Sequence, residues 1–572
     1  MIEMYSRKVT KFTLASYKQL NVEKLFYEEG GSPLESTSVE KRNFGTHPHL
    51  FVRWNETVIK SVRRYIKEEW RIKDKHRQSA VNIPFLNFLS GFLCRKLSDD
   101  FRLKLFAEAS IAKKIFVFEN PSMMRLLSAE KLKCCEDGKE VFNALKDSVR
   151  CVIAIMLIGF KFFKIHSFKK NKIKVKYFVV PSYQSVNSNA EFFSFYNAIN
   201  DSAVLVDSGT ELCMYLERQG SNIIMRNDLY INPAQILVLT KELLILLLHV
   251  TFKHRSWLLV NSVFRYIKEK AIILSYFNAV IPKYICIVRG DVYAAASLLR
   301  DIANKQSVKT VSFSHSSYYY PEYYLSDVDF DYFGASGQRE LDVYSPYWNQ
   351  KSNYIITGQM TSDYKSKISE LPLKNNKRPE LSVGVFPSSI NDVVIPNSEV
   401  SFDDFVQAVV LAVSGVNDMV LYYKSKTKLK ALRGDSTNYT ISNDDRALRV
   451  FEKSLAERYV DLDEDYTVYD MYSLIDIGFV YSMSTCAFEL MQKKCKVVVY
   501  VPFEKELHPF YKFTPLLVSS SIEEFIDKSK KIMTMSDENY SLYIKDTLNY
   551  CLIDSVTNDL GCEFVSAIEA VS

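Results

Sequence analysis

Short apolar runs recur through most of the chain, and stretches of helical character separate them. One example is the run 285–288 (ICIV), which is followed by a helical stretch at about 292–304 and by the run 310–313 (TVSF). Further strand-like runs lie at 115–118, 175–180, 203–206, 332–333 and 354–357, and a long helical stretch covers about 233–278. This alternation predicts a parallel, doubly wound α/β sheet.

A second series of the same kind follows a polar segment at 367–380, which carries two prolines and has the composition of a linker. Its expected strands lie at 381–386, 419–423, 467–469, 479–481, 496–501 and 516–519, and its expected helices at about 402–414, 444–457, 484–494 and 521–533. Two Rossmann-like domains with a cleft between them are therefore predicted. Ligands in such sheets bind at the carboxyl ends of the strands.

The first part of the chain has no clear rhythm of this kind. Residues 56–77 have the pattern of a charged amphipathic helix. The expected organisation is a mainly helical N-terminal extension at 1–110, a first Rossmann-like domain at 111–366, the linker at 367–380 and a second Rossmann-like domain at 381–572.

Composition excludes several classes of protein. The chain has 572 residues, of which 47% are hydrophobic, so it can bury more than one core. A net charge of +6 over this length is too small to indicate nucleic acid as a main ligand. The ten cysteines show no metal-binding spacing and are expected to be buried thiols in a reducing compartment. The N-terminus has no apolar signal-peptide core, so a cytoplasmic location is expected.

Two apolar runs, at 151–160 and 243–250, raise the question of a membrane. Each is well short of the roughly 18 apolar residues that span a bilayer. Seven lysines follow the first run between 161 and 176, a pattern also found in helices that lie at a membrane surface. Buried helices are the favoured interpretation, and peripheral contact with the inner face of the cytoplasmic membrane is the alternative.

Common catalytic motifs are missing from the sequence. It contains no GxGxxG after a strand, no GxxxxGK[ST], no HExxH and no GxSxG. This argues against a dinucleotide dehydrogenase, a P-loop kinase, a zincin and an α/β-hydrolase. Asp327 and Asp329 have the spacing of a metal–nucleotide site, but charged turn residues explain them better, and no metal site is predicted.

The first candidate site follows two expected strands. Arg289 and Asp291 come after the run 285–288, and Ser314, His315 and Ser316 come after 310–313. Both groups are expected at one edge of the sheet, where a histidine or a carboxylate can act as a general base. A hydrogen-bonded structural role for His315 is equally compatible with the local sequence.

The second candidate site lies in the second domain. Ser482, Ser484 and Thr485 follow the run 479–481 and precede a helix, where a hydroxyl is a preferred cap and a phosphate can bind. Glu489 is four residues after Thr485, on nearly the same helix face, and is a candidate for accepting hydrogen bonds from ribose hydroxyls. Lys424 follows the run 419–423 and is a candidate for neutralising a diphosphate. A plain helix cap and exposed charged side chains are the structural alternatives.

The order of these segments resembles that of GT-B glycosyltransferases of bacterial capsule and O-antigen synthesis, of the Kdo and sialic-acid type, and of CDP-glycerol glycerophosphotransferases. The shared features are a strand followed by Asp291, a strand followed by His315, the segment YIITGQMTSDY around Gly358, and the S-x-S-T-x-x-x-E helix start. The resemblance covers roughly 285–502. The chain departs from it in reading KSK where relatives have a His-Pro, KKCK where they have Gly-Lys-Pro, and SHSS at the histidine turn.

The resemblance implies a metal-independent enzyme without a cofactor, which transfers a sugar from a CMP-, UDP- or CDP-linked donor to a glycan or a lipid-linked acceptor. It places the donor nucleotide near Lys424, Ser482, Ser484, Thr485 and Glu489. The acceptor would approach Asp291 and His315, with Arg289, Ser314 and Ser316 beside them. Phospho-polyol transfer, a 2-epimerase-type nucleotide-sugar reaction and a non-catalytic scaffold of a polysaccharide assembly complex are the alternatives.

Overall fold

The structure is a computed structural model, and it describes several separate stretches of the chain. These are residues 2–8, 24–29, 39–41, 114–117, 132–134, 172–186, 190–249, 257–290, 293, 295–314, 328–344, 352–363, 379–387, 399–424, 439–462, 466, 468–472, 474–482, 484–501, 505–553 and 559–571. The helix expected at 56–77, the apolar run 151–160 and the linker up to residue 378 lie outside them.

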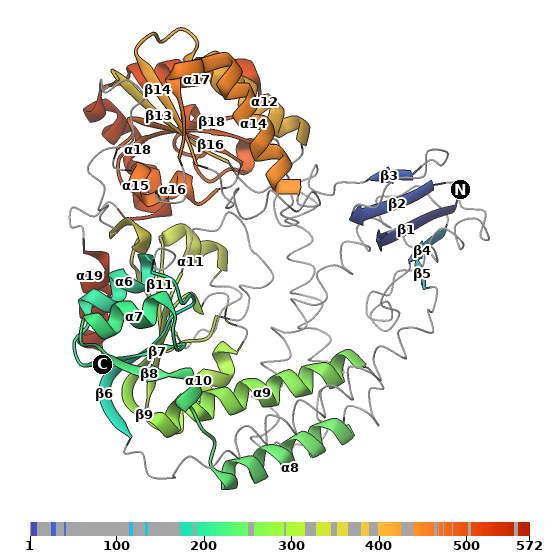
Figure 1. The fold of residues 1–572 in the computed structure, drawn as a ribbon, viewed down its shortest axis with the longest axis vertical. Helices are drawn as coiled ribbons and strands as arrows, with labels where there is room; N and C mark the ends of the chain where they lie inside the picture. Colours follow the sequence, from blue (N-terminus) through green and yellow to red (C-terminus); the bar gives the residue numbers. More distant parts are fainter. Residues whose placement is uncertain are drawn as a thin grey trace.

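Seven parallel strands form the sheet of the first domain, in the order β12-β11-β10-β9-β6-β7-β8 (Figure 1). They are β6 (Ile173–Val180), β7 (Ser202–Val206), β8 (Asn222–Met225), β9 (Val280–Ile287), β10 (Lys309–Phe313), β11 (Tyr332–Ala335) and β12 (Asn353–Ile356). If the strands are numbered in chain order from β6 and the sheet is read from its β8 edge, the order is 3-2-1-4-5-6-7. The chain therefore changes direction across the sheet between β6 and β9. This is the Rossmann order, and the predicted fold class is confirmed for this domain.

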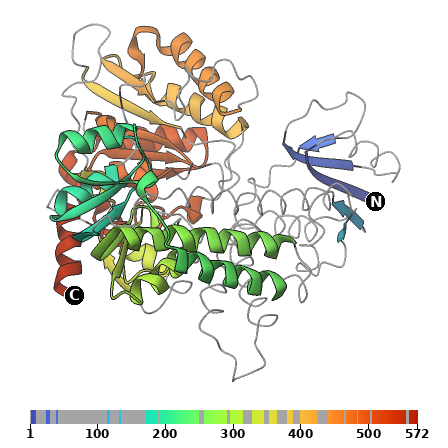
Figure 2. The same ribbon diagram turned by 60° about the horizontal axis from the view of Figure 1, so that its bottom comes forward.

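Helices accompany these strands as the alternating pattern predicted. They are α6 (Ala190–Ala198), α7 (Glu211–Arg218), α8 (Pro233–His249), α9 (Trp257–Ala279), α10 (Ala296–Asn304) and α11 (Gln338–Tyr344), with short 3-10 turns η2 (Arg226–Asp228) and η6 (Met360–Asp363). The single long helix expected at 233–278 is instead two helices. They lie side by side and project from the domain (Figures 1 and 2).

Six parallel strands form the second domain, in the order β15-β14-β13-β16-β17-β18, again 3-2-1-4-5-6 in chain order. They are β13 (Leu381–Phe386), β14 (Met419–Tyr423), β15 (Tyr459–Asp461), β16 (Ile477–Tyr481), β17 (Lys496–Tyr500) and β18 (Val518–Ser519). The helical elements are α12 (Glu399–Val413), α14 (Tyr439–Leu455), η7 (Ala456–Arg458), α15 (Val468–Tyr472), α16 (Cys486–Gln492), η8 (Lys505–Leu507), η9 (Pro515–Leu517), α17 (Ile522–Thr534), α18 (Asp537–Cys551) and α19 (Leu560–Val571). The strand expected at 467–469 is wrong, because Val468 and Tyr469 belong to α15.

Central strands of both sheets are buried on both faces. Val497, Val498 and Val499 of β17 have no exposed surface, and neither do Phe479 and Val480 of β16. Continuous rather than alternating burial is expected when helices cover both faces of a parallel sheet. The sequence shows the same thing as unbroken apolar runs.

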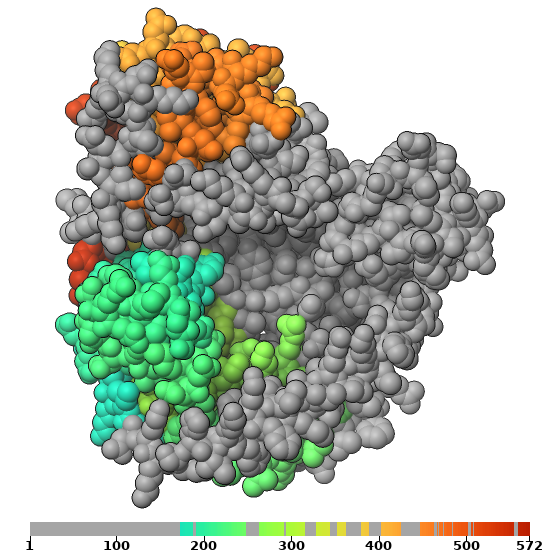
Figure 3. All heavy atoms as spheres, viewed as in Figure 1, coloured from blue at the N-terminus to red at the C-terminus, as the bar shows by residue number. Residues whose placement is uncertain are grey.

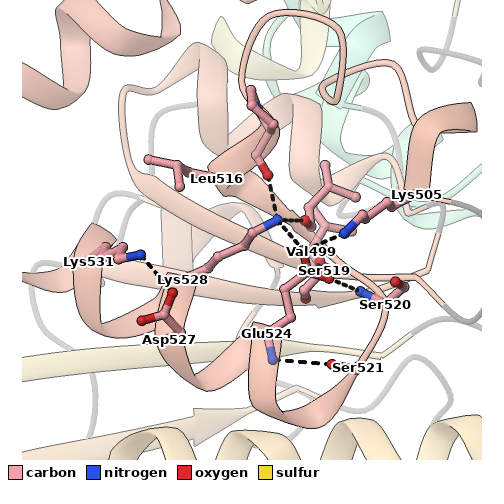
Figure 4. Close-up of polar contacts among 12 residues, drawn as sticks. Val499, Lys505, Leu516, Ser519, Ser520, Ser521, Glu524, Asp527, Lys528 and Lys531 are labelled. Atoms are coloured by element: carbon pink, nitrogen blue, oxygen red, sulfur yellow. Dashed lines mark hydrogen bonds and ion pairs between the residues drawn. The ribbon is translucent and has the colours of Figure 1, made fainter.

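The start of α17 shows how the edge of the second sheet is held (Figure 4). Ser521 caps the helix by accepting a hydrogen bond from the backbone N–H of Glu524, and the Glu524 carboxylate accepts one from the N–H of Ser520, the residue before the cap. The ammonium of Lys528 lies 2.8 Å from that carboxylate and also donates to the carbonyl oxygens of Pro515 and Val518. This buried network joins α17 to the segment that leads into β18.

The C-terminal helix leaves the second domain and packs on the first, which corrects the expected boundary of 381–572. In α19, Phe564 contacts Phe195 of α6 and Phe313 of β10. Glu569 accepts hydrogen bonds from Lys176 and Tyr177 of β6. In Figures 1 and 3 the dark red of this helix lies against the teal of the first domain. The last helix therefore belongs to the first domain by its packing, although it follows the second domain in the chain.

A third parallel sheet is formed near the N-terminus by β1 (Ile2–Lys8), β2 (Lys24–Glu29), β3 (Val39–Lys41), β4 (Lys114–Val117) and β5 (Leu132–Cys134). Its order is β3-β2-β1-β4-β5. The boundary expected at residue 110 falls inside this sheet, because β4 pairs with β1. The described residues of 1–110 are all in strands. The prediction of a mainly helical extension did not include these strands.

Candidate active site at the two switch points

Each of the two main sheets has a switch point, the place at which successive strands begin to be added on the other side. In the first sheet it lies between β6 and β9, and in the second between β13 and β16. Arg289 follows β9, and Ser482 follows β16. Both have a left-handed backbone, with φ of 57° and 58°. A non-glycine residue in this conformation costs on the order of 1 kcal/mol, and such strain concentrates at functional sites.

Arg289 is held by two side chains of its own domain. Its Nε and one terminal nitrogen donate to the same oxygen, Oε1 of Glu191, at 3.0 and 2.7 Å, and the other terminal nitrogen donates to the Tyr183 hydroxyl at 2.7 Å. Burial alone would lower the pKa of Arg289, but the neighbouring Glu191 carboxylate outweighs it and the pKa is raised. The guanidinium is therefore charged and positioned before any ligand arrives.

Gly290 allows the close approach that this turn requires. A Cβ at this position would lie 2.2 Å from the Oγ of Ser312 and 2.6 Å from the ring of Phe330. The backbone N–H of Gly290 donates to Ser312, whose hydroxyl in turn donates to the carbonyl of Ile287. The Arg289-Gly290 pair is thus fixed against the neighbouring strand β10.

The carboxylate of Glu191 has one oxygen without a donor among the described residues. Its Oε1 binds Arg289, whereas the buried Oε2 accepts no hydrogen bond from any described residue, and the side chain is only 1% exposed. Buried oxygens without a donor are rare and need an explanation. A ligand hydroxyl is one group that would supply the missing donor.

Ser482 has the same property in the second domain. Its backbone N–H donates to the carbonyl of Tyr500 on the adjacent strand at 2.7 Å, while its buried Oγ has no hydrogen-bond partner. The residue is therefore held by the backbone, and its hydroxyl, which is not exposed, has no partner among the described residues.

Glu489 differs from the expectation of a carboxylate facing a ribose. It is 5% exposed, and its two oxygens accept hydrogen bonds from Thr361 at 2.7 Å and from the hydroxyl of Tyr472. Burial raises the pKa of Glu489 to about 7, a rise that these two bonds oppose and the nearby Glu191 adds to. Glu489 is therefore a buried carboxyl at the contact between the domains, and its role towards a ribose stays a prediction.

That contact is built from the segment around Gly358, which the sequence had singled out. The backbone N–H of Gln359 donates to the side-chain oxygen of Gln492 at 2.9 Å. This bond joins the same two segments as the hydrogen bond between Thr361 and Glu489. Gly358 has φ of 71°, and a Cβ there would lie 2.8 Å from Gln492 and 2.4 Å from Ile553. Only glycine fits where η6 meets α16.

Tyr469 lies in the same region and feels charges from both domains. Burial raises its pKa, as do the carboxylates of Glu489 and Glu191, while Arg289 lowers it. The first-domain pair Arg289–Glu191 and the second-domain residues Tyr469 and Glu489 therefore form one electrostatic group. We call these four residues the interdomain cluster.

The remaining donor-side residues differ from the expected helix cap. Thr485 precedes α16 with a helical φ of −59°, and its side chain makes no capping hydrogen bond. Thr485 is thus at the N-cap position of α16, but its hydroxyl does not cap the helix. Ser484 is partly buried and its backbone carbonyl accepts from Ala487. Lys424 follows β14 and its ammonium lies 3.5 Å from the carbonyl oxygen of Leu462. Because β14 and β16 flank β13, Lys424 and Ser482 lie at the same edge of the second sheet.

On the acceptor side, Ser314 has a structural partner. It is 5% exposed and donates to Glu340 at 2.8 Å, within a network that also holds Ser336 at the start of α11. We therefore assign Ser314 to the structure of the sheet edge. Asp291, His315 and Ser316 lie outside the described residues. The strands that precede Asp291 and His315, β9 and β10, are neighbours in the sheet.

Asp329 is held by Arg300, which accounts for it without a metal. Its predicted companion, Asp327, is outside the described residues. Within the described stretches, no group of three or more potential ligands is arranged to hold a metal ion. In the same stretches, no helix has both the length and the apolar character needed to cross a bilayer.

Three residues of this site were not singled out from the sequence: Glu191, Tyr183 and Thr361. Glu191 and Tyr183 follow β6, the first strand of the Rossmann order. Because ligands bind beside this strand, at the switch point, polar residues that follow it could have been chosen as candidates. Thr361 lies in the segment around Gly358 that the sequence had singled out, but its own role was not visible, because its partner is 128 residues away.

No family model and no curated protein matches the chain. Similar solved structures include the α,α-trehalose-phosphate synthase (UDP-forming) of Burkholderia vietnamiensis, at 10% identity over 69% of this chain and 99% of that one, with a TM-score of 0.40. A UDP-glucosyltransferase of Polygonum tinctorium matches at 10% identity over 70% and 99%, with a TM-score of 0.40. The O-GlcNAc transferase of Thermobaculum terrenum matches at 13% identity over 93% and 98%, with a TM-score of 0.33. Likenesses this distant carry no argument about function, which rests on the residues described above.

Proposed function

We propose that this chain is a glycosyltransferase of GT-B type, which moves a sugar from a nucleotide-activated donor to a glycan or lipid-linked acceptor. The observation that carries the proposal is the pairing of two Rossmann-order sheets. At the switch point of each, a strained residue, Arg289 or Ser482, marks the position where such sheets bind ligands. The interdomain cluster brings side chains of the two domains into one electrostatic environment.

The donor nucleotide binds the second domain in this proposal. Lys424 and the hydroxyl of Ser482 lie at one sheet edge and are suited to a phosphate and its oxygens. Negative charge develops on the departing phosphate, and a fixed ammonium stabilises it without a metal ion. CMP-, CDP- and UDP-linked donors all carry the required phosphate.

The acceptor binds the first domain. Deprotonation of its hydroxyl requires a base, for which Asp291 and His315 were proposed from the sequence. Glu191 is a third candidate, because its Oε2 is buried, accepts no hydrogen bond and is held in place through Oε1. The bacterial surface glycan named by the resemblance is the proposed acceptor class.

Transfer assays test the proposal. The purified chain is incubated with CMP-, CDP- and UDP-linked sugars and with CDP-glycerol, together with glycan and lipid-linked acceptors, and the products are identified by mass spectrometry. A glycosylated product supports the proposal, whereas a glycerophosphate product would assign phospho-polyol transfer. Turnover of a donor to an epimer without any acceptor would assign an epimerase.

Variants separate the roles of the three candidate bases. Glu191→Gln, His315→Ala and Asp291→Asn are compared at equal folded fraction, checked by circular dichroism. Loss of turnover with nucleotide binding retained identifies the base. If all three variants keep normal turnover, the acceptor side of the proposal is wrong.

A further inference from the structure

The helix α8 has a broad apolar face that is exposed to solvent. Its four most exposed large side chains are Leu237, Val238, Leu244 and Ile245, with 73%, 61%, 56% and 50% of their surface accessible. Residues three, four and seven positions apart lie on the same side of a helix, so these four side chains and Lys241 form one exposed face. The opposite face packs inward, with Leu239, Leu243 and Leu246 buried. A helix that is apolar all round is ordinarily buried on all sides or meets a membrane.

The charges of α8 are distributed unevenly between its two faces. Glu242 is 5% exposed and accepts hydrogen bonds from Tyr266 and Lys270 of α9. Its negative charge is therefore turned inward and neutralised. Lys241 is exposed, and it is the sole charged side chain on the exposed face of α8 as far as the structure describes that helix.

The partner helix α9 continues this pattern. Its exposed charged residues in the described part are Arg265 and Lys268, both basic. Glu269 is partly buried. An exposed apolar helix face whose described charged side chain is a cation, on a helix pair whose other described exposed charges are also basic, is complementary to a lipid surface that carries negative charge.

We propose that the exposed face of α8 docks this protein on an anionic lipid bilayer, with Leu237, Val238, Leu244 and Ile245 entering the interface and Lys241 facing the headgroups. The two helices project from the first domain in both views, and green surface from this pair reaches the lower edge of the molecule (Figures 1, 2 and 3). A second copy of the chain fits this face less well, because a two-fold contact would set Lys241 near its own counterpart. The inference does not depend on the proposed transfer reaction.

Attachment of this kind is weak, reversible and sensitive to salt, because a few aliphatic side chains and a few cations supply it. It differs from a membrane span, which no helix of the described stretches can form. It also places the described part of the apolar run at 243–250 on a surface helix, with Leu243 and Leu246 buried and Leu244 and Ile245 exposed.

Vesicle sedimentation with the full chain tests the proposal. Vesicles of phosphatidylcholine alone are compared with vesicles of phosphatidylcholine and phosphatidylglycerol, at low and high salt. The test variant is Leu237→Glu with Leu244→Glu. The matched control is Leu542→Glu, because Leu542 is 72% exposed on α18 of the second domain. All of these positions are on the surface, so the fold should persist, and circular dichroism melting verifies it.

The expected result is binding of the unchanged chain and of the control to anionic vesicles, reduced by salt. The test variant should bind at least about tenfold more weakly. Lys241→Glu should weaken binding to anionic vesicles and leave binding to neutral ones unchanged.

Two results would overturn the proposal. One is equal vesicle binding by the unchanged chain and the test variant, including no binding by either. The other is a dimer, seen by sedimentation equilibrium without lipid, that the test variant dissociates and the control does not. That dimer would make α8 a protein interface.

Discussion

Replacing Glu489 by glutamine should make the stability of the protein less sensitive to pH between about 4.5 and 7. Glu489 is buried at the contact between the domains, and both of its oxygens accept hydroxyl hydrogen bonds, from Thr361 and Tyr472. Glutamine keeps the shape, and either hydroxyl can turn to accept a hydrogen bond from its amide. The change therefore removes the ionisation with little effect on packing.

The size of the effect follows from the pKa. Burial raises the pKa of Glu489 from its ordinary value of 4.5 to about 7, because the charged form loses its hydration. The folded state therefore favours the neutral carboxyl. Its contribution to stability is complete below pH 4.5 and is lost as the pH rises through about 7. The difference between the two values corresponds to about 3 kcal/mol of unfolding free energy.

Urea unfolding of the unchanged chain and of Glu489→Gln, followed by circular dichroism from pH 5 to pH 8, measures this contribution. The variant should gain up to about 3 kcal/mol relative to the unchanged chain between these limits. Glu452→Gln is the matched control, because Glu452 is exposed on α14, and its effect should stay constant. A constant difference for Glu489→Gln as well would show that this carboxyl is ionised throughout, and the burial argument would fail.

Three further changes test other parts of the structure. Arg289→Met should destabilise the protein by about 3 kcal/mol, because it leaves Glu191 buried without its cation. In urea unfolding, the double variant Arg289→Met, Glu191→Met should recover most of this loss. Additive losses from the two changes would contradict the pairing. Glu524→Gln should remove about 1 kcal/mol of stability at pH 7 and much less at pH 2. Hydrogen bonds from Lys505 and Lys528 outweigh burial and lower the pKa of Glu524 to about 2, so its contribution to stability is lost as the pH falls from 4.5 to 2. Equal losses at both pH values in thermal unfolding would refute this. Gly290→Ala should cost about 2 kcal/mol in urea unfolding, because its Cβ would overlap Ser312 and Phe330. Gly415→Ala, where a Cβ meets nothing within 4 Å, should be nearly neutral, and equal costs for the two would contradict the packing.

The two Rossmann-like sheets could be predicted from the sequence because their strands are unbroken apolar runs. The runs at 381–386 and 419–423 match β13 and β14 residue for residue, and the runs near β6, β10 and β17 differ by one or two residues at an end. Such strands are buried on both faces, so hydrophobicity alone marks them. The sequence did not predict the short strand β15 or the short helix α15, because three to five residues give no clear periodicity.

The candidate site was predicted in part. Strand ends located Arg289, Ser482 and Lys424, since polar residues after apolar runs are visible in the sequence. The buried position of Glu489 was not visible, because it depends on Thr361, far along the chain in another domain. The return of α19 to the first domain was hidden for the same reason: only its packing on α6 shows where it belongs.

Nucleotide binding by the full chain tests the central claim most directly. Thermal shift and calorimetric titration with CMP, CDP and UDP are compared for the unchanged chain and for Lys424→Ala and Ser482→Ala. The account predicts that at least one of these nucleotides raises the melting temperature at millimolar concentration, and that both variants weaken this binding. No binding of any of the three by the unchanged chain would contradict a nucleotide-sugar transferase and would favour a non-catalytic scaffold.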